Sequence, residues 1–382
     1  MHVLILPSWY PNTNSSLSGV FFKEQAEVIA SKHIKVGCIA INESAFRYVL
    51  NGKEKSFLYT DELTNSVQTM SLVYPSINRL KRVRAYVRKQ VFKTLFKTYV
   101  KKHGKPDIVH LHSFLYGDLA MWIKEKYNIN YIITEHSSAF LRGLLSNKEL
   151  DLAYDVFSNA SYNIVVSEVF RHFLKREFNV DFHFIPNMVD TNFFTLKSNK
   201  KESGFTFVNI ASLDKKKNQD ILLEAFYKAF GNHKKVKLMI IGDGEEYDNL
   251  NQRIKTLGLQ SQVTLYGRAN RYEVRELLHT SSACVLSSEV ETFGVVLIEA
   301  MACGLPVLST KCGGPESIIV NKKIGELVEQ NANSLSKGML TVYNGSYDSD
   351  FIRDYAIKKF SSDVISKKLI KVYLNNSNKI MV

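Results

Sequence analysis

The chain has 382 residues and a formal net charge of +13, with 45% hydrophobic and 23% charged residues. This is an ordinary globular composition with room for about two domains. Four scattered cysteines without paired ligand spacing argue against a disulfide framework or a zinc site. No stretch approaches the roughly 20 apolar residues of a membrane span, and the opening MHVLILPSW lacks the basic start of a signal peptide. We therefore expect a cytoplasmic protein.

In the first half of the chain, short β-branched runs alternate with helical patterns. The β-branched runs are HVLIL, IKVGCIAI, DIVHLHS, YIITEH and YNIVVS. The helical patterns include FFKEQAEVIAS, GDLAMWIKEKY and SEVFRHFLKREF. This alternation predicts βαβ units, in which a parallel sheet is covered by helices on both faces.

Residues 79–105 carry eleven Lys or Arg and no acidic residue. Apolar residues recur in this segment at helical spacing, namely Leu80, Val83, Val87, Val91, Leu95 and Tyr99. The pattern predicts an amphipathic helix with a basic outer face, which is either a plain solvated surface or a contact with an anionic membrane at the inner face of the cell. We predict no nucleic-acid partner, because no RNA- or DNA-reading motif accompanies the segment.

Between residues 185 and 204 the periodicity lapses, and the strand and helix rhythm then restarts through FTFVNIA, VKLMIIG, VTLYG, ACVLSS, PVLS and IGELV. We therefore predict an α/β protein of two Rossmann-like domains, 1–190 and 191–357. A C-terminal helix at about 358–382 is a candidate to pack back onto the first domain. Ligands of parallel sheets bind at the carboxyl ends of the strands, so both sheets are expected to face a cleft between the domains.

The stretch 287–309 contains two glutamates, Glu291 and Glu299, in a run of apolar and small residues. A strand precedes it, and VVLIEAMAC predicts a helix that ends at Gly304. The first amides of this helix would lie at its positive end and hold a diphosphate; they belong to Phe293, Gly294 and Val295. Glu299, about 7 Å along the helix axis from Gly294, would then meet an attached ribose, and Glu291 would meet a sugar.

The Glu-x7-Glu within ETFGVVLIEAMACGLPV resembles the signature of the retaining nucleotide-sugar glycosyltransferases of family 4. Further segments resemble those of the family in the same order: IPNMVDTNFF, LDKKKNQDILLEAF, IIGDGEEYDNL and CGGPESIIV. The resemblance covers nearly the entire chain and implies the GT-B fold. It also implies transfer of a sugar from UDP or GDP to a hydroxyl of a glycan or lipid-linked acceptor, with retention, in bacterial surface polysaccharide synthesis. The acceptor would bind to the first domain and the donor to the second.

By this resemblance, Glu291 would bind hydroxyls of the transferred sugar, Glu299 the ribose, and Lys217 the diphosphate. The family usually has an arginine at the position of Ser212, and Arg268 or Lys215 is a candidate to replace it. Residues Gly267 and Arg268 would also flank the base.

In the first domain, His136 lies where the family places an active-site histidine against the sugar. Gly19, in the loop NTNSSLSGVFF, would let the backbone approach the phosphate or the acceptor. The alternation in HLH puts His110 and His112 on one face of a strand, where we expect structural roles.

The pair Asp348 and Asp350 imitates an Asp-x-Asp metal site, but it precedes a helical pattern and is better explained by capping. We expect no metal, and no cofactor besides the donor substrate. Two alternatives stay open. One is a sugar-nucleotide epimerase of the same two-domain shape, and the other is a non-catalytic polyanion or membrane binder built around residues 79–105.

Overall fold

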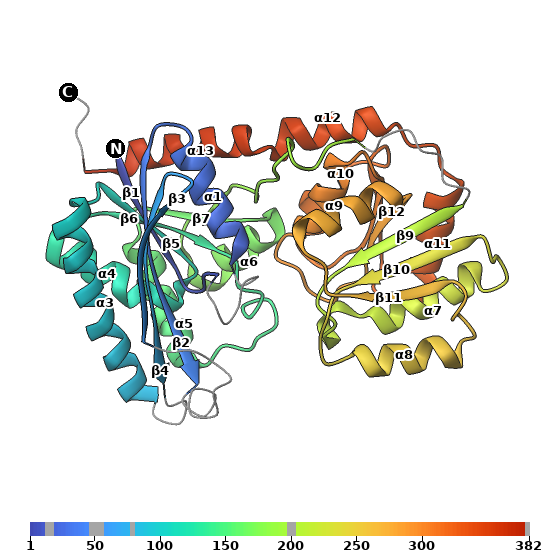
Figure 1. Ribbon diagram of the computed structural model, residues 1–382, viewed down its shortest axis with the longest axis horizontal. Coiled ribbons are helices and arrows are strands. Elements are labelled where there is room, and N and C mark those ends of the chain that lie inside the picture. Colours follow the sequence, from blue (N-terminus) through green and yellow to red (C-terminus); the bar gives the residue numbers. More distant parts are fainter. Residues whose placement is uncertain (12–18, 46–56, 77–80, 197–203, 379–382) are drawn as a thin grey trace. The chain divides into compact units, whose positions relative to one another are not determined.

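The structure is a computed structural model that describes residues 1–11, 19–45, 57–76, 81–196 and 204–378, with the backbone alone at residues 45, 81 and 82. The chain divides into two compact units, each built around a sheet with helices on both faces (Figure 1). Unit 1 comprises Met1–Val165, Leu174–Ile185 and Ser366–Val382. Unit 2 comprises Val166–Phe173 and Pro186–Ile365.

The sheet of unit 1 has the order β3-β4-β2-β1-β5-β6-β7-β8. Its strands are β1 (His2–Pro7), β2 (Lys35–Ala45), β3 (Leu58–Thr64), β4 (Val67–Ser76), β5 (Ile108–His112), β6 (Tyr131–Glu135), β7 (Tyr162–Val165) and β8 (His183–Phe184). The described pairs are parallel except for β3 with β4, which is antiparallel. Without β3 and β8, the order is that of a Rossmann sheet, in which the first strand lies between the second and the fourth.

The β3 and β4 hairpin was not predicted, and it makes the sheet of unit 1 mixed rather than purely parallel. Its strands are rich in threonine, serine and charged residues, and only some of their positions are buried. The edge of a sheet tolerates such a composition because one side of the edge strand lacks a partner strand. The long β-branched runs that identify central strands are therefore missing.

The helices of unit 1 are α1 (Val20–Ala30), α3 (Lys81–His103), α4 (Gly117–Tyr127), α5 (Asn147–Asn159) and the second half of α6 (Glu168–Phe178), with a short 3-10 helix, η1 (Phe114–Tyr116). The predicted helix at 79–105 is therefore present as α3, while residues 79 and 80 lie outside the described part of the chain.

The predicted apolar face of α3 is wrong in its first half. Leu95 and Tyr99 are buried as expected, and Phe92 and Phe96 join them, but Val83 and Val87 are 54% and 37% exposed, although they belong to the same predicted face. At 1.5 Å per residue α3 is about 35 Å long. Only its C-terminal part therefore contributes to the core of unit 1.

The sheet of unit 2 has the order β11-β10-β9-β12-β13-β14, with all described pairs parallel. Its strands are β9 (Phe205–Ile210), β10 (Val236–Ile241), β11 (Val263–Gly267), β12 (Ala283–Leu286), β13 (Val307–Thr310) and β14 (Gly325–Val328). The longer helices are α7 (Gln219–Phe230), α8 (Tyr247–Thr256), α9 (Arg271–Thr280), α10 (Val295–Ala302), α11 (Ala332–Asn344) and α12 (Ser349–Phe360), and the 3-10 helices are η2 (Lys215–Lys217) and η3 (Pro315–Ser317). This is again the Rossmann order.

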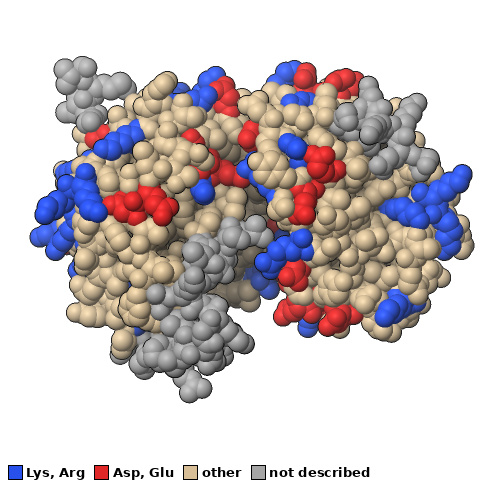
Figure 2. Space-filling model, viewed as in Figure 1, with Lys and Arg blue, Asp and Glu red and all other residues tan. Residues whose placement is uncertain are grey.

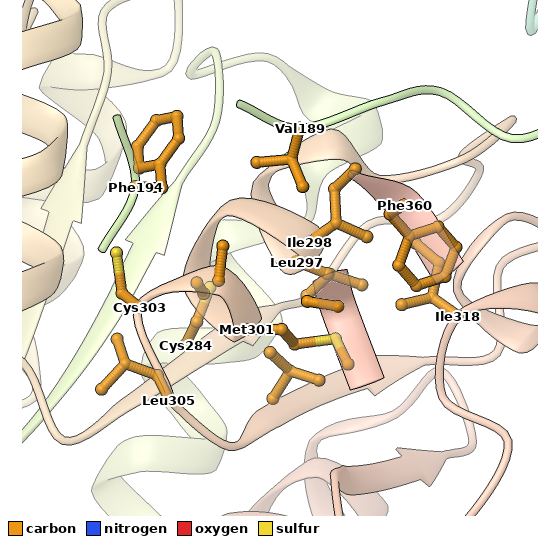
Figure 3. Close-up of a cluster of buried hydrophobic side chains, with 14 of the residues drawn as sticks. Val189, Phe194, Cys284, Leu297, Ile298, Met301, Cys303, Leu305, Ile318 and Phe360 are labelled. Atoms are coloured by element: carbon orange, nitrogen blue, oxygen red, sulfur yellow. The ribbon is translucent and has the colours of Figure 1, made fainter. Parts of the chain in front are cut away.

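Strand residues of unit 2 alternate between two hydrophobic cores. Val208, Cys284 and Leu286 join the core that contains α10, whereas Phe207 and Val285 join the core on the other face of the sheet. The sequence VVLIEAMA makes α10 apolar on nearly every side, and Leu297, Ile298 and Met301 pack among side chains of several elements (Figure 3). Because α10 is enclosed in this way, its N-terminus is held firmly at the end of β12.

The C-terminal segment forms two helices, α12 and α13 (Ser362–Asn376), which are separated by the extended residue Ser361. From Ser366 onward the chain belongs to unit 1, where Tyr373 is fully buried. Residues 379–382 of the predicted helix lie outside the described residues. No helix in the described ranges is both long and apolar enough to cross a membrane.

Candidate functional site

Lys217 and Glu291 meet at the switch point of unit 2, where β9 and β12 lie side by side and ligands of such sheets bind. Lys217 ends the short helix η2 after β9, and Glu291 lies in the loop after β12. The Lys217 Nζ donates to Glu291 Oε1 at 2.5 Å, and the two side chains are only 16% and 15% exposed. The fold thus brings together two predicted site residues that are 74 positions apart.

Two adjacent serines hold one member of this ion pair each. Ser288 Oγ donates to Glu291 Oε1 at 2.8 Å. Ser287 Oγ donates to the main-chain carbonyl of Lys217, also at 2.8 Å. Neither serine was predicted as a site residue, and the only sequence signal is their place between a buried strand and the glutamate.

The Gly-Gly-x-Glu loop supports the backbone at Glu291. The amide of Glu291 donates to the carbonyl of Cys312 at 2.9 Å, and the amide of Gly314 donates to the carbonyl of Glu291 at 2.8 Å. The Gly313 amide donates to both carboxylate oxygens of Glu316, at 3.0 and 2.9 Å. Burial raises the pKa of Glu316, although these hydrogen bonds act in the opposite direction. Glu316 is therefore part of the scaffold under the Lys217 and Glu291 pair.

Helix α10 begins beside this pair without a side-chain cap. Gly294 is its N-cap and has a φ of 102°, in the left-handed region that favours glycine. Phe293 is 2% exposed, and its ring lies 6.0 Å from that of Phe360, so that only its backbone can meet a ligand. Val295 is the first helical residue. An uncapped helix start suits an anion because its amides point outward at the positive end of the helix.

Glu299 lies within α10 and is half-buried. Its negative charge adds to burial in raising the pKa of the Cys284 thiol and, to about 12, that of the Cys303 thiol. Both cysteines are consequently unreactive thiols. The position of Glu299 on α10, about 7 Å along the axis from Gly294, is the one that the sequence predicted.

The two residues expected to supply a second cation lie in different places, Lys215 in η2 directly after β9 and Arg268 after the edge strand β11. Ser212, at the position of the family's arginine, is exposed and donates to Asp214 Oδ2 at 2.7 Å. Arg268 follows Gly267 at the end of β11 and pairs with Asp243 across 3.1 Å, where both side chains are more than half exposed. Lys215 is exposed. The replacement of the arginine by Arg268 or Lys215 stays a prediction.

In unit 1, His136 directly follows β6 and meets His112, the last residue of β5, with 3.2 Å between His136 Nε2 and His112 Nδ1. The ring of His110 lies 4.1 Å from that of His112, so both side chains are on one face, as predicted. The Tyr373 hydroxyl is 2.7 Å from His110 Nδ1. Burial lowers the pKa of His110 and His136 to about 3, and that of His112 well below its usual range.

A buried carboxylate that was not predicted shapes the turn at His136. Glu135 accepts hydrogen bonds from the amides of Phe114, His136 and Ser137, each at 2.8 Å. Burial raises its pKa while these bonds act to lower it. The turn that presents His136 is therefore fixed by its neighbour in the sequence.

The remaining predicted positions have local structural explanations. Gly19 is the N-cap of α1 with a φ of 71°, and a Cβ there would lie 2.6 Å from the carbonyl oxygen of Trp9. Most of its loop, residues 12–18, lies outside the described residues. Asp348 caps α12 by accepting from the amides of Asp350 and Phe351, which confirms the predicted capping role. Within the described ranges, no group of three or more His, Cys, Asp or Glu could hold a metal ion.

Comparison with known proteins agrees with this architecture. A family model described as glycosyl transferases group 1 matches residues 190–359, and one described as glycosyltransferase family 4 matches residues 54–193. The chain belongs to this glycosyltransferase family. N-acetyl-alpha-D-glucosaminyl L-malate synthase of Bacillus anthracis is 33% identical to it over 159 residues, which are 40% of this chain and 41% of that protein.

Solved structures of similar fold cover nearly the whole glycosyltransferase chain. Sucrose-phosphate synthase from Thermosynechococcus elongatus superposes with a TM-score of 0.79 at 18% identity, over 98% of this chain and 99% of that one. Anabaena HepE, solved in complex with UDP and glucose, superposes with a TM-score of 0.73 at 18% identity, over 98% and 100%. The expected GT-B fold is thereby confirmed.

Proposed function

We propose that this glycosyltransferase moves a sugar from UDP or GDP to a hydroxyl of a glycan or lipid-linked acceptor, with retention of configuration, in bacterial surface polysaccharide synthesis. The observation that carries the proposal is the contact of Lys217 with Glu291 beside the start of α10. The contact places Lys217, a cation that can bind a diphosphate, next to Glu291, a carboxylate that can accept hydrogen bonds from sugar hydroxyls. The presence of UDP and glucose in the HepE structure supports a donor of this class.

The transfer breaks the bond between the anomeric carbon and the diphosphate oxygen, and the bonding electrons leave with the phosphate. A bond from the anomeric carbon to the acceptor oxygen forms on the same face, and the departing phosphate takes the acceptor proton. Lys217 and the amides of Gly294 and Val295 would stabilise the negative charge that collects on the diphosphate. Glu291 would orient the sugar by accepting from its hydroxyls, and Glu299 would accept from the ribose.

In the proposed reaction, positive charge from the protein neutralises the leaving diphosphate, a task that a bound metal ion performs in many other enzymes that act on phosphates. The ammonium of Lys217 and the start of α10 supply it at one end of the sheet, so we propose a reaction without a metal or another cofactor. Full activity in excess EDTA is the expected result. Restoration of lost activity by Mg²⁺ or Mn²⁺ would contradict this part of the proposal.

Unit 1 is proposed to bind the acceptor. His136 would meet the transferred sugar, and the backbone at Gly19 would approach the phosphate or the acceptor. Gly267 and Arg268, at the end of β11, would flank the base of the donor.

The central test uses calorimetry with UDP and GDP, followed by incubation with a panel of UDP- and GDP-sugars. We expect one nucleotide to bind and one sugar to be released to water or to an added acceptor, with loss of release in Lys217→Met. An isomerised sugar that stays on its nucleotide would identify an epimerase instead. Binding of heparin and anionic vesicles without binding of either nucleotide would identify a non-catalytic polyanion binder.

Contact with an anionic membrane is a further part of the proposal. The exposed first half of α3 presents Val83, Tyr86 and Val87 at the spacing of one helix face. Lys and Arg side chains gather at the left edge of unit 1 in Figure 2, where Figure 1 places α4 and the C-terminal end of α3. Part of the basic charge is already paired, since Arg84, Arg88 and Lys102 contact Glu43, Asp118 and Asp61, respectively. An apolar anchor is therefore needed beside the remaining charge.

Co-sedimentation with vesicles tests this contact. We expect binding to vesicles that contain phosphatidylglycerol and little binding to phosphatidylcholine alone, with loss in Tyr86→Ser/Val87→Ser. The double variant Tyr227→Ser/Tyr247→Ser removes two other exposed tyrosines, on α7 and α8, and is the matched control. Equal sedimentation of both variants would exclude α3 as the anchor.

A further inference from the structure

The imidazole rings of His110, His112 and His136 form a row near the carboxyl ends of β5 and β6. The ring centroids of His110 and His112 are 4.1 Å apart, and those of His112 and His136 are 5.5 Å apart. His112 is completely buried, and the ring of Phe22 lies 4.5 Å from it. The proposed function uses only His136, so the role of His112 remains to be explained.

The contact between His112 and His136 restricts which ring nitrogens can carry a hydrogen. Burial lowers the pKa of both rings far enough that each is neutral at pH 7. A neutral imidazole carries a hydrogen on one nitrogen and a lone pair on the other. Across the 3.2 Å between His112 Nδ1 and His136 Nε2, one nitrogen must therefore donate and the other accept.

Two arrangements satisfy this condition. In the first, His136 Nε2–H donates to His112 Nδ1, and both rings adopt the Nε2–H form that free histidine favours. In the second, His112 Nδ1–H donates to His136 Nε2, and both rings adopt the less favoured Nδ1–H form. In both arrangements His112 Nε2 is buried without a hydrogen-bond partner in the described structure. The first arrangement places an N–H there and the second a lone pair, and the neighbouring Phe22 ring, 4.5 Å from the His112 ring, suits an N–H better.

We infer that His112 is a positioning residue that holds His136 as its Nε2–H tautomer and leaves the lone pair on His136 Nδ1. The ring of His136 is further bounded by Phe21 and Phe22, whose centroids lie 5.3 and 5.1 Å away in edge-to-face contact. The hydrogen bond with His112 and the ring contacts with Phe21 and Phe22 thus restrict both the rotation and the tautomer of His136.

This assignment has a consequence for specificity, which rests on the proposed contact of His136 with the transferred sugar. Nδ1 can accept a hydrogen bond and cannot donate one, so it selects a hydroxyl or an amide N–H on the sugar. Fluorine in place of that hydroxyl can only accept and would not be held. The fluorinated sugar would lose the hydrogen bond from its hydroxyl to His136 Nδ1. This bond joins two uncharged groups, so its loss should lower the rate or the affinity roughly 2- to 13-fold.

The neighbouring contact of His110 supplies a matched control. Its Nδ1 is 2.7 Å from the Tyr373 hydroxyl and its Nε2 is 2.7 Å from Thr134 Oγ1, so both of its nitrogens are engaged away from His136. Tyr373→Phe removes one buried hydrogen bond of this row without touching His112 or His136. Tyr373→Phe should therefore lower the stability of unit 1 as a His112 variant would, while it leaves the tautomer of His136 unchanged.

The experiment is nitrogen NMR of the full chain labelled with ¹⁵N-histidine at pH 7. The chain has ten histidines, and the resonances that vanish in His136→Gln assign His136. We expect a protonated Nε2 and an unprotonated Nδ1 in the wild type and in Tyr373→Phe. His112→Asn places an oxygen acceptor near the former Nδ1 and should preserve this pattern, whereas His112→Phe should populate both tautomers.

Kinetics complete the test. We expect His112→Phe to lower kcat roughly 2- to 13-fold with unchanged UDP affinity, and His112→Asn to recover most of the loss. A protonated Nδ1 of His136 in the wild type, or an unchanged tautomer in His112→Phe, would overturn the inference. The spectra need no substrate, so a protein that transfers no sugar would refute the proposed function and leave the tautomer assignment standing.

Discussion

Replacement of Glu291 by glutamine should separate the proposed recognition of the sugar from that of the nucleotide. Glu291 Oε1 accepts from Lys217 Nζ at 2.5 Å and from Ser288 Oγ at 2.8 Å, and an amide oxygen can accept both bonds in the same place. The fold should therefore survive in Glu291→Gln. The negative charge that would grip the sugar hydroxyls is lost, and Lys217 no longer faces a carboxylate.

A charge-assisted hydrogen bond contributes about 1.5 to 3 kcal/mol, which corresponds to roughly 10- to 150-fold. We expect kcat for sugar transfer or donor hydrolysis to fall by this factor in Glu291→Gln. The affinity for the free nucleotide should stay within a few fold of wild type or improve, because Lys217 becomes available to the diphosphate. Initial rates with the donor sugar and calorimetry with the free nucleotide measure the two quantities separately.

Glu289→Gln is the matched control for this experiment. It removes the same charge from the same loop, but Glu289 is exposed, and its amide rather than its side chain holds the loop, by donating to the carbonyl of Lys216 at 2.7 Å. Its rates should match the wild type. If Glu291→Gln retained wild-type kcat, or if it lost nucleotide affinity and rate by equal factors, Glu291 would have no special role toward the sugar.

Three further outcomes are expected. Glu299→Gln should weaken nucleotide binding roughly 10- to 150-fold in calorimetry, because its carboxylate is proposed to hold the ribose, and unchanged affinity would exclude that contact. Gly314→Ala should lower the unfolding free energy by about 1 to 3 kcal/mol in urea titration, because the new Cβ would lie 2.3 Å from backbone atoms of Phe293. Gly258→Ala is the control, since its new Cβ would meet no atom within 4 Å and would add only the backbone strain of a φ of 66°. Stability should fall as pH drops from 6.5 toward 3, by up to about 1.4 kcal/mol per pH unit for each buried histidine, because the lowered pKa of His110 and His136 lets the unfolded chain bind protons first. Melting curves of His136→Gln should show a shallower loss over that range, and an identical slope would contradict the lowered pKa.

The architecture was largely predictable because buried parallel strands have a simple composition. The β-branched runs located the central strands of both units, and the helix start at Gly294 followed from a strand, a loop and an apolar run. The hairpin of β3 and β4 escaped because hydroxyl-bearing residues at a sheet edge do not form such runs. The predicted apolar face of α3 is misplaced because the valines and the phenylalanines both recur at helical spacing, and Phe92 and Phe96 are the ones that fill the core.

The candidate site was predictable where a residue carries its own chemistry and not where partners define its role. Glu291 could be singled out as a carboxylate beside a helix start, whereas Lys217 could be told from the neighbouring Lys215 and Lys216 only by the family resemblance of LDKKKNQDILLEAF. Ser288, Glu135 and His112 act through hydrogen bonds to residues on other loops or through main-chain amides, and no local pattern reports those bonds. A serine beside a strand is otherwise most often a simple turn residue.

The contact of Lys217 with Glu291 also explains how a site for a charged donor can be stable before the donor binds. Two charges that are about one-sixth exposed have lost much of their hydration, and each compensates the other. In the proposed reaction, the diphosphate of an entering donor would replace the carboxylate as the partner of Lys217, and its sugar hydroxyls would replace the ammonium as partners of Glu291. Neither charge is left alone in that exchange. Because Ser287 and Ser288 hold the two residues through separate bonds, Lys217 and Glu291 would stay in position while they change partners, which is the preorganisation that the proposed stabilisation of a leaving diphosphate requires.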